Sequence, residues 1–207
     1  MEKPAVQKCS NCWKEVSLCI CKTIQSFQTH SRILVLQHPQ EAKNPLGTAR
    51  LTSLTLKNSV HRVGLSWRSL SAALGEEAES KDWAVLFLGA LKDTPKVSDK
   101  PFQILTRKGT QVSPNEIKGI VILDGNWKQS KTLWWRNPWL LKLKRVVLNP
   151  TEPSMYGEVR KQPRKGCLST IEAVAETLNH MGEKPEISKR LRSLFARHLD
   201  QVKDLNL

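Results

Sequence analysis

The sequence predicts an α/β fold in which helices cover both faces of a largely parallel β-sheet. Continuous runs of Val, Ile and Leu, typical of strands buried on both faces, occur at residues 32–39, 83–89, 119–125 and 145–150. Segments with apolar residues at helical spacing separate these runs, which favours crossover helices between parallel strands. The chain has 207 residues, of which 39% are hydrophobic, enough for one domain of ordinary size with its own core.

The first half of the chain alternates strands with short helices. After the strand at residues 32–39, residues 47–59 have helical spacing, and Thr48 stands where it can cap the helix start. Residues 60–65 predict a short strand, and residues 67–74 predict a second short helix. This order is the one expected of βαβ units.

The second half repeats this alternation and ends in two helices. Residues 92–101 predict a polar loop, and the segment between the strands at 119–125 and 145–150 is long enough for a crossover helix. A long loop rich in proline and glycine follows at residues 150–166. Residues 169–181 begin as Ser-x-x-Glu, a capping box, and residues 186–205 form an amphipathic final helix.

The charge of the chain points to a polyanionic partner. The formal net charge is +14, and residues 128–166 alone carry ten Lys or Arg against two Glu, a net charge of +8. Nucleic acid is the first candidate partner, and an anionic membrane surface is the second. No apolar run approaches the ~20 residues that span a bilayer, and the N-terminus lacks the apolar core of a signal peptide. We therefore expect a cytoplasmic protein with no membrane partner.

Four cysteines share a short N-terminal stretch with the pattern C-x2-C-x6-C-x-C: Cys9, Cys12, Cys19 and Cys21. Thiols stay reduced in the cytosol, where clustered cysteines favour a metal over disulfides. Four thiolates suit a tetrahedral Zn²⁺ with no open position, so we expect a structural ion rather than a catalytic one. An iron–sulfur cluster, a redox pair and unligated thiols remain as alternatives. A knuckle of this size would depend on its metal to fold.

One predicted strand runs directly into a carboxylate, Asp124. Ligands of parallel α/β sheets lie beyond the carboxyl ends of the strands, where His38, Gly89 and Asn149 are also expected. Asp-Gly is equally a strong turn pair, so the spacing leaves Asp124 open between a turn and a functional role. The chain contains no G-x-G-x-x-G, P-loop, G-x-S-x-G or H-E-x-x-H motif, which disfavours the common dinucleotide, nucleotide and hydrolase sites.

Tryptophan is concentrated after this strand, at Trp127, Trp134, Trp135 and Trp139. A tryptophan at a helix start usually belongs to the core, and packing is the simpler interpretation of the other three as well. Aromatic faces also stack on unpaired bases, so one or two of these rings are candidates to face RNA.

Four blocks of the sequence carry a family resemblance. They are the four-cysteine knuckle, residues 36–51 (LQHPQEAKNPLGTARL), residues 123–127 (LDGNW) and residues 150–175. In these blocks and their order the chain resembles the DTW-domain family of tRNA-uridine aminocarboxypropyltransferases, within the SPOUT-like group of knotted α/β proteins. The resemblance implies a C-terminal trefoil knot, a zinc knuckle at residues 1–30 and a catalytic domain at residues 31–207.

The chain departs from the family at one motif position. The family motif usually reads Asp-x-Thr-Trp, and Asn126 holds the threonine position here. Asn also has a short polar side chain able to cap a helix, so the change puts details of the site in question rather than its existence.

The resemblance implies transfer of the 3-amino-3-carboxypropyl group of S-adenosylmethionine to N3 of a uridine in tRNA, with 5′-methylthioadenosine as by-product. N3 lies on the pairing edge and carries a proton, so the base must be unpaired and a general base must take the proton. A SPOUT-type RNA methyltransferase and a non-catalytic zinc-containing RNA-binding protein are the alternatives. The target uridine and the oligomeric state stay open.

The resemblance also distributes roles among residues. Asp124 and Trp127 would be catalytic. The donor pocket would be formed by strand ends and the start of one helix, whose amides suit a carboxylate: Leu88, Gly89, Leu123, Asp124, Gly125, Asn126, Leu148, Leu168, Ser169, Thr170 and Glu172. A further set of polar residues would contact the RNA: His38, Glu41, Thr48, Arg50, Lys128, Tyr156, Arg160, Lys161, Arg164 and Lys165.

Overall fold

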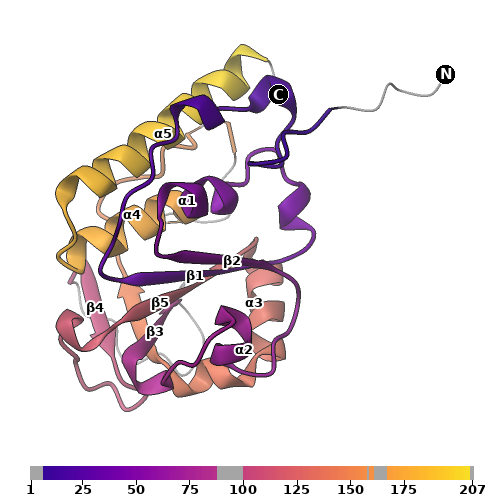
Figure 1. Ribbon diagram of the computed structural model, residues 1–207. Helices are drawn as coiled ribbons and strands as arrows, with labels where there is room; N and C mark the ends of the chain where they lie inside the picture. The colour runs from indigo at the N-terminus through magenta and orange to yellow at the C-terminus, as the bar shows by residue number, and fades with distance from the viewer. Residues whose placement is uncertain (1–6, 88–99, 158, 161–166, 206–207) are drawn as a thin grey trace.

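The computed structural model describes residues 7–87, 100–157, 159–160 and 167–205 (Figure 1). Its centre is a six-stranded sheet with the order β2-β1-β5-β3-β6-β4, in which only the β4–β6 pair is antiparallel. The strands are β1 (Arg32–Gln37), β2 (Ser59–Val63), β3 (Trp83–Phe87), β4 (Phe102–Leu105), β5 (Gly119–Asp124) and β6 (Lys144–Leu148). The predicted α/β class and the largely parallel sheet are thus confirmed.

Helices cover both faces of the sheet, as Figure 1 shows. The helices α1 (Ala49–Thr55), α4 (Thr170–His180) and α5 (Pro185–Asp204) lie on one face, and α2 (Leu70–Leu74) and α3 (Trp127–Arg136) lie on the other. Each face has its own hydrophobic cluster. Within β5, Ile120 and Ile122 pack under α1 and α4, while Val121 and Leu123 pack under α2 and α3. This alternation explains why the buried strands read as continuous apolar runs.

Most predicted elements match the structure to within two or three residues at each end, but β4 was missed. Residues 102–105 pair antiparallel with β6 at the sheet edge. A strand of four residues that follows a polar loop gives too short a pattern to be recognised. The predicted loop at residues 92–101 and the end of the predicted strand at residues 83–89 fall largely outside the described residues.

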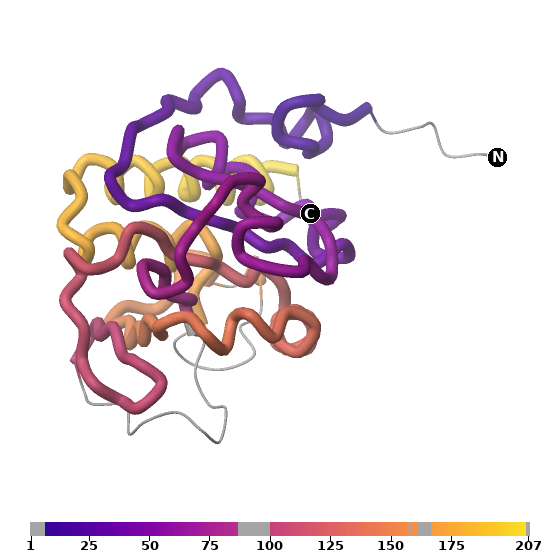
Figure 2. Tube along the Cα trace, turned by 60° about the horizontal axis from the view of Figure 1, so that its bottom comes forward, coloured from indigo at the N-terminus to yellow at the C-terminus, as the bar shows by residue number. Residues whose placement is uncertain are grey.

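The N-terminal segment packs on the α1, α4 and α5 side of the molecule. Figure 2 shows it beside the C-terminal helix and away from α3. Cys12 and Ile20 belong to the same hydrophobic cluster as the sheet face beneath α4. Gln201 Nε2 on α5 donates to the Ser17 carbonyl at 2.7 Å. The segment is therefore fixed to the main core by both apolar and polar contacts.

In the described part of the chain, no helix combines the length and the apolar character that crossing a membrane requires.

Candidate active site

Asp124 ends β5 with its carboxylate buried, at 4% exposure. Two side chains donate hydrogen bonds to it: Gln37 Nε2 reaches Oδ2 at 2.8 Å, and Thr170 Oγ1 reaches Oδ1. Burial raises the pKa of Asp124 to about 6, although both hydrogen bonds oppose this rise. A carboxyl group whose pKa lies near neutrality is suited to accept a proton from a substrate.

Gln37 is held in place by a second, half-buried partner, His61. It lies opposite Asp124 in the register of β1 and β5, and its amide oxygen is 3.0 Å from His61 Nε2 on β2. Because the amide nitrogen donates to Asp124, we assign the ring proton to Nε2 of His61. Burial, together with the charge of Arg50, lowers the pKa of His61 to about 4, so this ring is neutral at pH 7.

The sequence-based site prediction did not include Gln37 or His61. The available signal for Gln37 was its position, because it ends the apolar run of β1 as Asp124 ends that of β5. Nothing in the sequence marks His61, whose role depends on the pairing of β1 with β2.

A second wall of the site is formed by Glu41, Arg160 and Tyr156. Both terminal nitrogens of Arg160 lie 3.2 Å from Glu41 Oε1, and its guanidinium lies 5.4 Å from the centre of the Tyr156 ring. The Tyr156 hydroxyl donates to the Leu46 carbonyl at 3.0 Å. Burial raises the pKa of Tyr156 to about 12, which keeps this hydroxyl neutral.

These residues enclose a cavity of about 110 Å³. Eight of its lining residues had been predicted, in three separate segments of the chain, to bind the donor or the RNA. They are Glu41, Thr48, Asp124, Tyr156, Arg160, Leu168, Ser169 and Thr170. Gly47 and Cys167, which were not predicted, complete the lining within the described residues. The structure therefore brings together the centre of the predicted set.

The start of α4 closes one side of the cavity. Ser169 caps this helix, and Glu172 accepts hydrogen bonds from the Ser169 amide at 2.9 Å and from the Ser169 hydroxyl at 2.6 Å. Glu172 also accepts from Ser154 Oγ at 2.6 Å and from the Met155 amide at 2.7 Å. It lies behind the cavity lining, at 1% exposure, and ties the loop before α4 to the helix.

Two of the backbone amides at the start of α4 already have a hydrogen-bond acceptor within the protein. Ile171 N donates to Thr48 Oγ1 at 3.2 Å, and Glu172 N lies 3.3 Å from Ser169 Oγ. The first of these bonds also joins α4 to Thr48, the residue before α1. A ligand carboxylate at this helix would thus meet fewer amides than the sequence alone suggests.

The predicted residues at the start of α3 lie beside the cavity rather than in its lining. Asn126 Oδ1 accepts from Gln129 N at 3.0 Å, which forms a capping box at the helix start. A Cβ atom on Gly125 would lie 2.8 Å from Gln129 Cβ, so glycine allows this helix to start tightly against the strand. Trp127 and Lys128 are both exposed to solvent.

The other predicted residues are more scattered. The side chain of Leu123 points to the α2 and α3 face of the sheet, and Leu148 ends β6 beside the opposite cluster. His38 forms the turn after β1 and accepts from Gln40 N at 3.2 Å. Arg50 lies over the ring of Trp13, 4.5 Å from its centre. Leu88, Gly89, Lys161, Arg164 and Lys165 lie outside the described residues.

Lys14 connects the N-terminal segment to the cavity wall. Its Nζ donates to the Pro45 carbonyl at 2.5 Å and to the Gly47 carbonyl at 2.8 Å, and the side chain is buried. A smaller hollow of about 90 Å³ lies here and shares Glu41 and Gly47 with the larger cavity.

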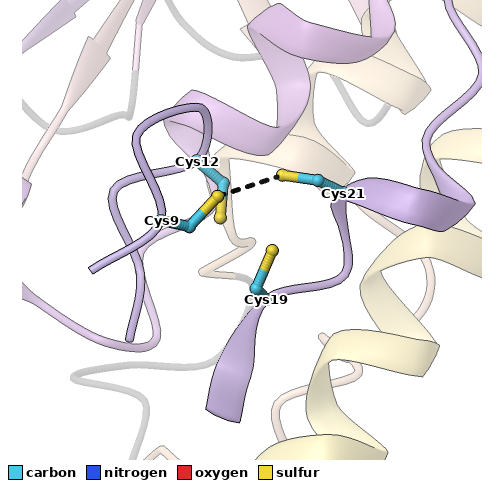
Figure 3. A group of neighbouring side chains, drawn as sticks. All are labelled: Cys9, Cys12, Cys19 and Cys21. Carbon is cyan, nitrogen blue, oxygen red and sulfur yellow. Dashed lines mark hydrogen bonds between the residues drawn. The ribbon is translucent and has the colours of Figure 1, made fainter. Parts of the chain in front are cut away.

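The four N-terminal cysteines converge as their spacing predicts (Figure 3). Their sulfur atoms all lie within 4.8 Å of one another, and the Sγ atoms of Cys9 and Cys21 are 3.8 Å apart. A Zn²⁺ ion with Zn–S bonds of about 2.3 Å would place tetrahedral ligands roughly 3.8 Å apart. The four thiols therefore fit a single metal ion.

The chain is similar to known proteins over most of its length. Residues 6–203 match the model of the DTW domain. A Drosophila melanogaster protein named tRNA-uridine aminocarboxypropyltransferase 2 is 28% identical over 190 residues, which cover 89% of this chain and 70% of that protein.

Two further relatives carry closely similar names. The Macaca fascicularis tRNA-uridine aminocarboxypropyltransferase 2 is 26% identical, over 89% of this chain and 59% of its own length. The Arabidopsis thaliana tRNA-uridine aminocarboxypropyltransferase A is 27% identical, over 91% of this chain and 78% of its own length. No solved structure matches the chain at a significant level.

Proposed function

Because the chain belongs to the DTW-domain family, we propose that it is a tRNA-uridine aminocarboxypropyltransferase that uses S-adenosylmethionine as donor. The observation that carries this proposal is the buried Asp124 carboxyl, whose pKa is raised to about 6 and which lines a cavity. The product is 3-(3-amino-3-carboxypropyl)uridine, and 5′-methylthioadenosine is released.

In the proposed reaction, Asp124 takes the proton from N3 of an unpaired uridine. N3 forms a bond to the donor carbon next to sulfur, the carbon–sulfur bond breaks, and its electron pair stays with the neutral thioether that leaves. Gln37 and Thr170 orient the carboxylate by donating to one oxygen each. Positioning selects the aminocarboxypropyl carbon over the methyl carbon, because both are bound to the same sulfur.

The polar lining of the cavity suits the amino-acid end of the donor. Arg160 can bind a carboxylate, and Glu41 can bind an ammonium group. The cavity of about 110 Å³ is smaller than the roughly 300 Å³ of a typical ligand pocket, so it fits the reacting end and not the whole donor. We propose that Leu88 and Gly89 complete the donor pocket and that Lys161, Arg164 and Lys165 contact the RNA, within a SPOUT-like knot.

We further propose that Cys9, Cys12, Cys19 and Cys21 hold a structural Zn²⁺. Four sulfur ligands leave no open position for catalysis. The ion would stabilise a knuckle at residues 1–30 that braces the catalytic domain at residues 31–207, through Lys14 among other contacts. We expect the protein to act in the cytoplasm.

The test is a reaction of the purified protein with unmodified tRNA transcripts and S-adenosylmethionine, followed by nucleoside mass spectrometry. We expect a uridine to gain an aminocarboxypropyl mass. Asp124→Asn is expected to abolish the gain while tRNA still binds, and Asp200→Asn, an exposed change on α5, is the matched control. A methyl mass would indicate a methyltransferase, and tRNA binding without any new mass would indicate a binding module.

A further inference from the structure

The exposed face of α3 combines aromatic and cationic side chains in one row. Trp127, Lys131 and Trp135 follow at intervals of four residues, which places them on one side of the helix. Trp127 is 43% exposed and Trp135 is 65% exposed, while Lys128 and Lys131 are exposed beside them. We refer to these four residues as the α3 stripe.

Packing does not explain the exposure of Trp135 on this face of α3. The helix is anchored by its opposite face, through Ser130, Leu133 and Trp134, which are all buried. Trp135 has the largest exposed fraction among the exposed large hydrophobic side chains of the described residues. Large aromatic side chains that stay in solvent on one helix face are typical of surfaces that bind a partner.

The charge of the α3 stripe indicates which class of partner it binds. Helix α3 carries three exposed cations, Lys128, Lys131 and Arg136, and no Asp or Glu. Cations interleaved with aromatic rings match a nucleic acid strand, whose phosphates bind the cations and whose bases stack on the rings. A helix that lies on a membrane instead separates an apolar face from a charged face.

The position of the α3 stripe connects it to the cavity. Trp127 is three residues after Asp124, and the helix leads away from the site toward Trp135. Eight residues of helix rise by about 12 Å, a span of a few nucleotides. The α3 stripe is therefore within reach of nucleotides next to a base that enters the cavity.

We propose that the α3 stripe binds unpaired nucleotides of the tRNA that flank the target uridine, with Trp135 as a stacking residue and Lys131 as a phosphate contact. This inference rests on the proposed function for the identity of the RNA. It gives Trp135 and Lys131 a role in substrate affinity that is separate from the chemistry at Asp124.

The test measures the affinity of the full-length protein for a fluorescently labelled, unmodified tRNA transcript in the absence of donor. Trp135→Ala is expected to raise Kd at least about fivefold, the lower limit for losing one stacked base. Trp135→Phe keeps an aromatic face and is expected to restore most of the affinity. Lys131→Ala is expected to reduce the slope of log Kd against log salt by about one.

Lys189→Glu on α5 is the matched control for Lys131→Glu, because both lysines are exposed and their helices, α5 and α3, cover opposite faces of the sheet. We expect only Lys131→Glu to weaken tRNA binding. Melting temperatures should stay unchanged in the Trp135 variants, because that side chain makes little contact with the core.

Two results would overturn the proposal. One is wild-type tRNA affinity in both Trp135→Ala and Lys131→Glu. The other is binding to phosphatidylserine vesicles that Trp135→Ala abolishes while tRNA affinity stays unchanged, which would assign the α3 stripe to a membrane. Both measurements are independent of transfer, so a protein that binds tRNA through the α3 stripe but transfers nothing would contradict only the proposed function.

Discussion

Helices α3 and α4 both begin at the candidate active site with a capping box, and they differ in burial. The box of α3 consists of the exposed Asn126 and the half-buried Gln129, whereas that of α4 consists of the buried Ser169 and Glu172. Three of the ten α3 residues are buried, against seven of the eleven α4 residues. The same local motif thus starts a helix that presents side chains to a partner and a helix that builds the wall of a cavity.

The largest expected effect is on stability, and it distinguishes two neighbouring tryptophans of α3. Trp134 is 6% exposed and Trp135 is 65% exposed. Trp134→Ala should lower the free energy of unfolding by about 3–5 kcal/mol because it leaves a large cavity in the core. Trp135→Ala should change it by less than about 0.5 kcal/mol. Urea denaturation of both variants checks this, and similar losses would contradict the outward role of α3.

The second comparison uses the third helical residue of each capping box. Glu172→Ala leaves the buried Ser169 amide and the partly buried Met155 amide without their acceptor, and we expect it to lower the free energy of unfolding by about 3 kcal/mol. Gln129→Ala removes a half-buried cap and should cost less than about 1 kcal/mol. Thermal and urea unfolding of the two variants are the measurements. If both variants lose the same stability, burial does not distinguish the two helix starts.

The third prediction concerns Asp124, which lies between the two helices and is bonded to α4 through Thr170. Burial raises the pKa of Asp124 from an ordinary value of 3.8 to about 6, so between these pH values the folded state holds a proton that the unfolded chain releases. Stability therefore falls as pH rises through this window.

The isosteric Asp124→Asn change stays neutral at every pH. At pH 8 it is expected to be more stable than the unchanged protein by up to about 3 kcal/mol, at ~1.4 kcal/mol for each pH unit between the two pKa values. Below pH 4 the difference should vanish. Urea denaturation at both pH values is the measurement, and a difference that does not depend on pH would show that burial does not raise this pKa.

The fourth prediction compares how a residue of α4 and a residue of α3 affect the pKa of Asp124. Thr170→Val removes a hydrogen bond that lowers the pKa of Asp124, so the acid limb of the kcat profile should move to higher pH, by about one pH unit or less. Asn126→Ala on α3 touches no Asp124 oxygen among the described contacts and should leave that limb in place. A shift in both variants would point to a general loosening of the site.

The smallest effect is expected at the position where the chain departs from its family. Asn126→Thr exchanges one good N-cap for another, and the free energy of unfolding should change by less than about 0.5 kcal/mol. Its kcat should stay within twofold if Asn126 only caps α3. A larger gain or loss of activity in a steady-state assay would give this side chain a direct part in catalysis.

The sequence was sufficient to predict the strands that carry the site, because continuous apolar runs and a capping box are local signals. Core packing was the simpler interpretation of Trp134, Trp135 and Trp139. The structure confirms it for Trp134 and Trp139, at 6% and 7% exposure, and contradicts it for Trp135, which is 65% exposed. Trp127, for which the core was the favoured prediction, is instead 43% exposed, because α3 packs on the sheet through Ser130, Leu133 and Trp134.

Other parts of the site depend on contacts that no local pattern encodes. The bonds of Asp124 to Gln37 and Thr170 join residues that are 87 and 46 positions away. Gln37 in turn depends on His61, through the order β2-β1-β5. Sheet order and register decide such pairs, so only the complete fold reveals them.

The wide spacing of Gln37, Asp124 and Thr170 also has a consequence for biosynthesis. A ribosome releases the N-terminal knuckle and β1 long before β5 and α4, yet β1 finds its central neighbour only when β5 arrives. The carboxyl of Asp124 gains its last hydrogen-bond donor only after residue 170 has emerged. The nascent chain is therefore expected to remain catalytically silent at least until α4 has left the ribosome, long after the residues of β1 have become available.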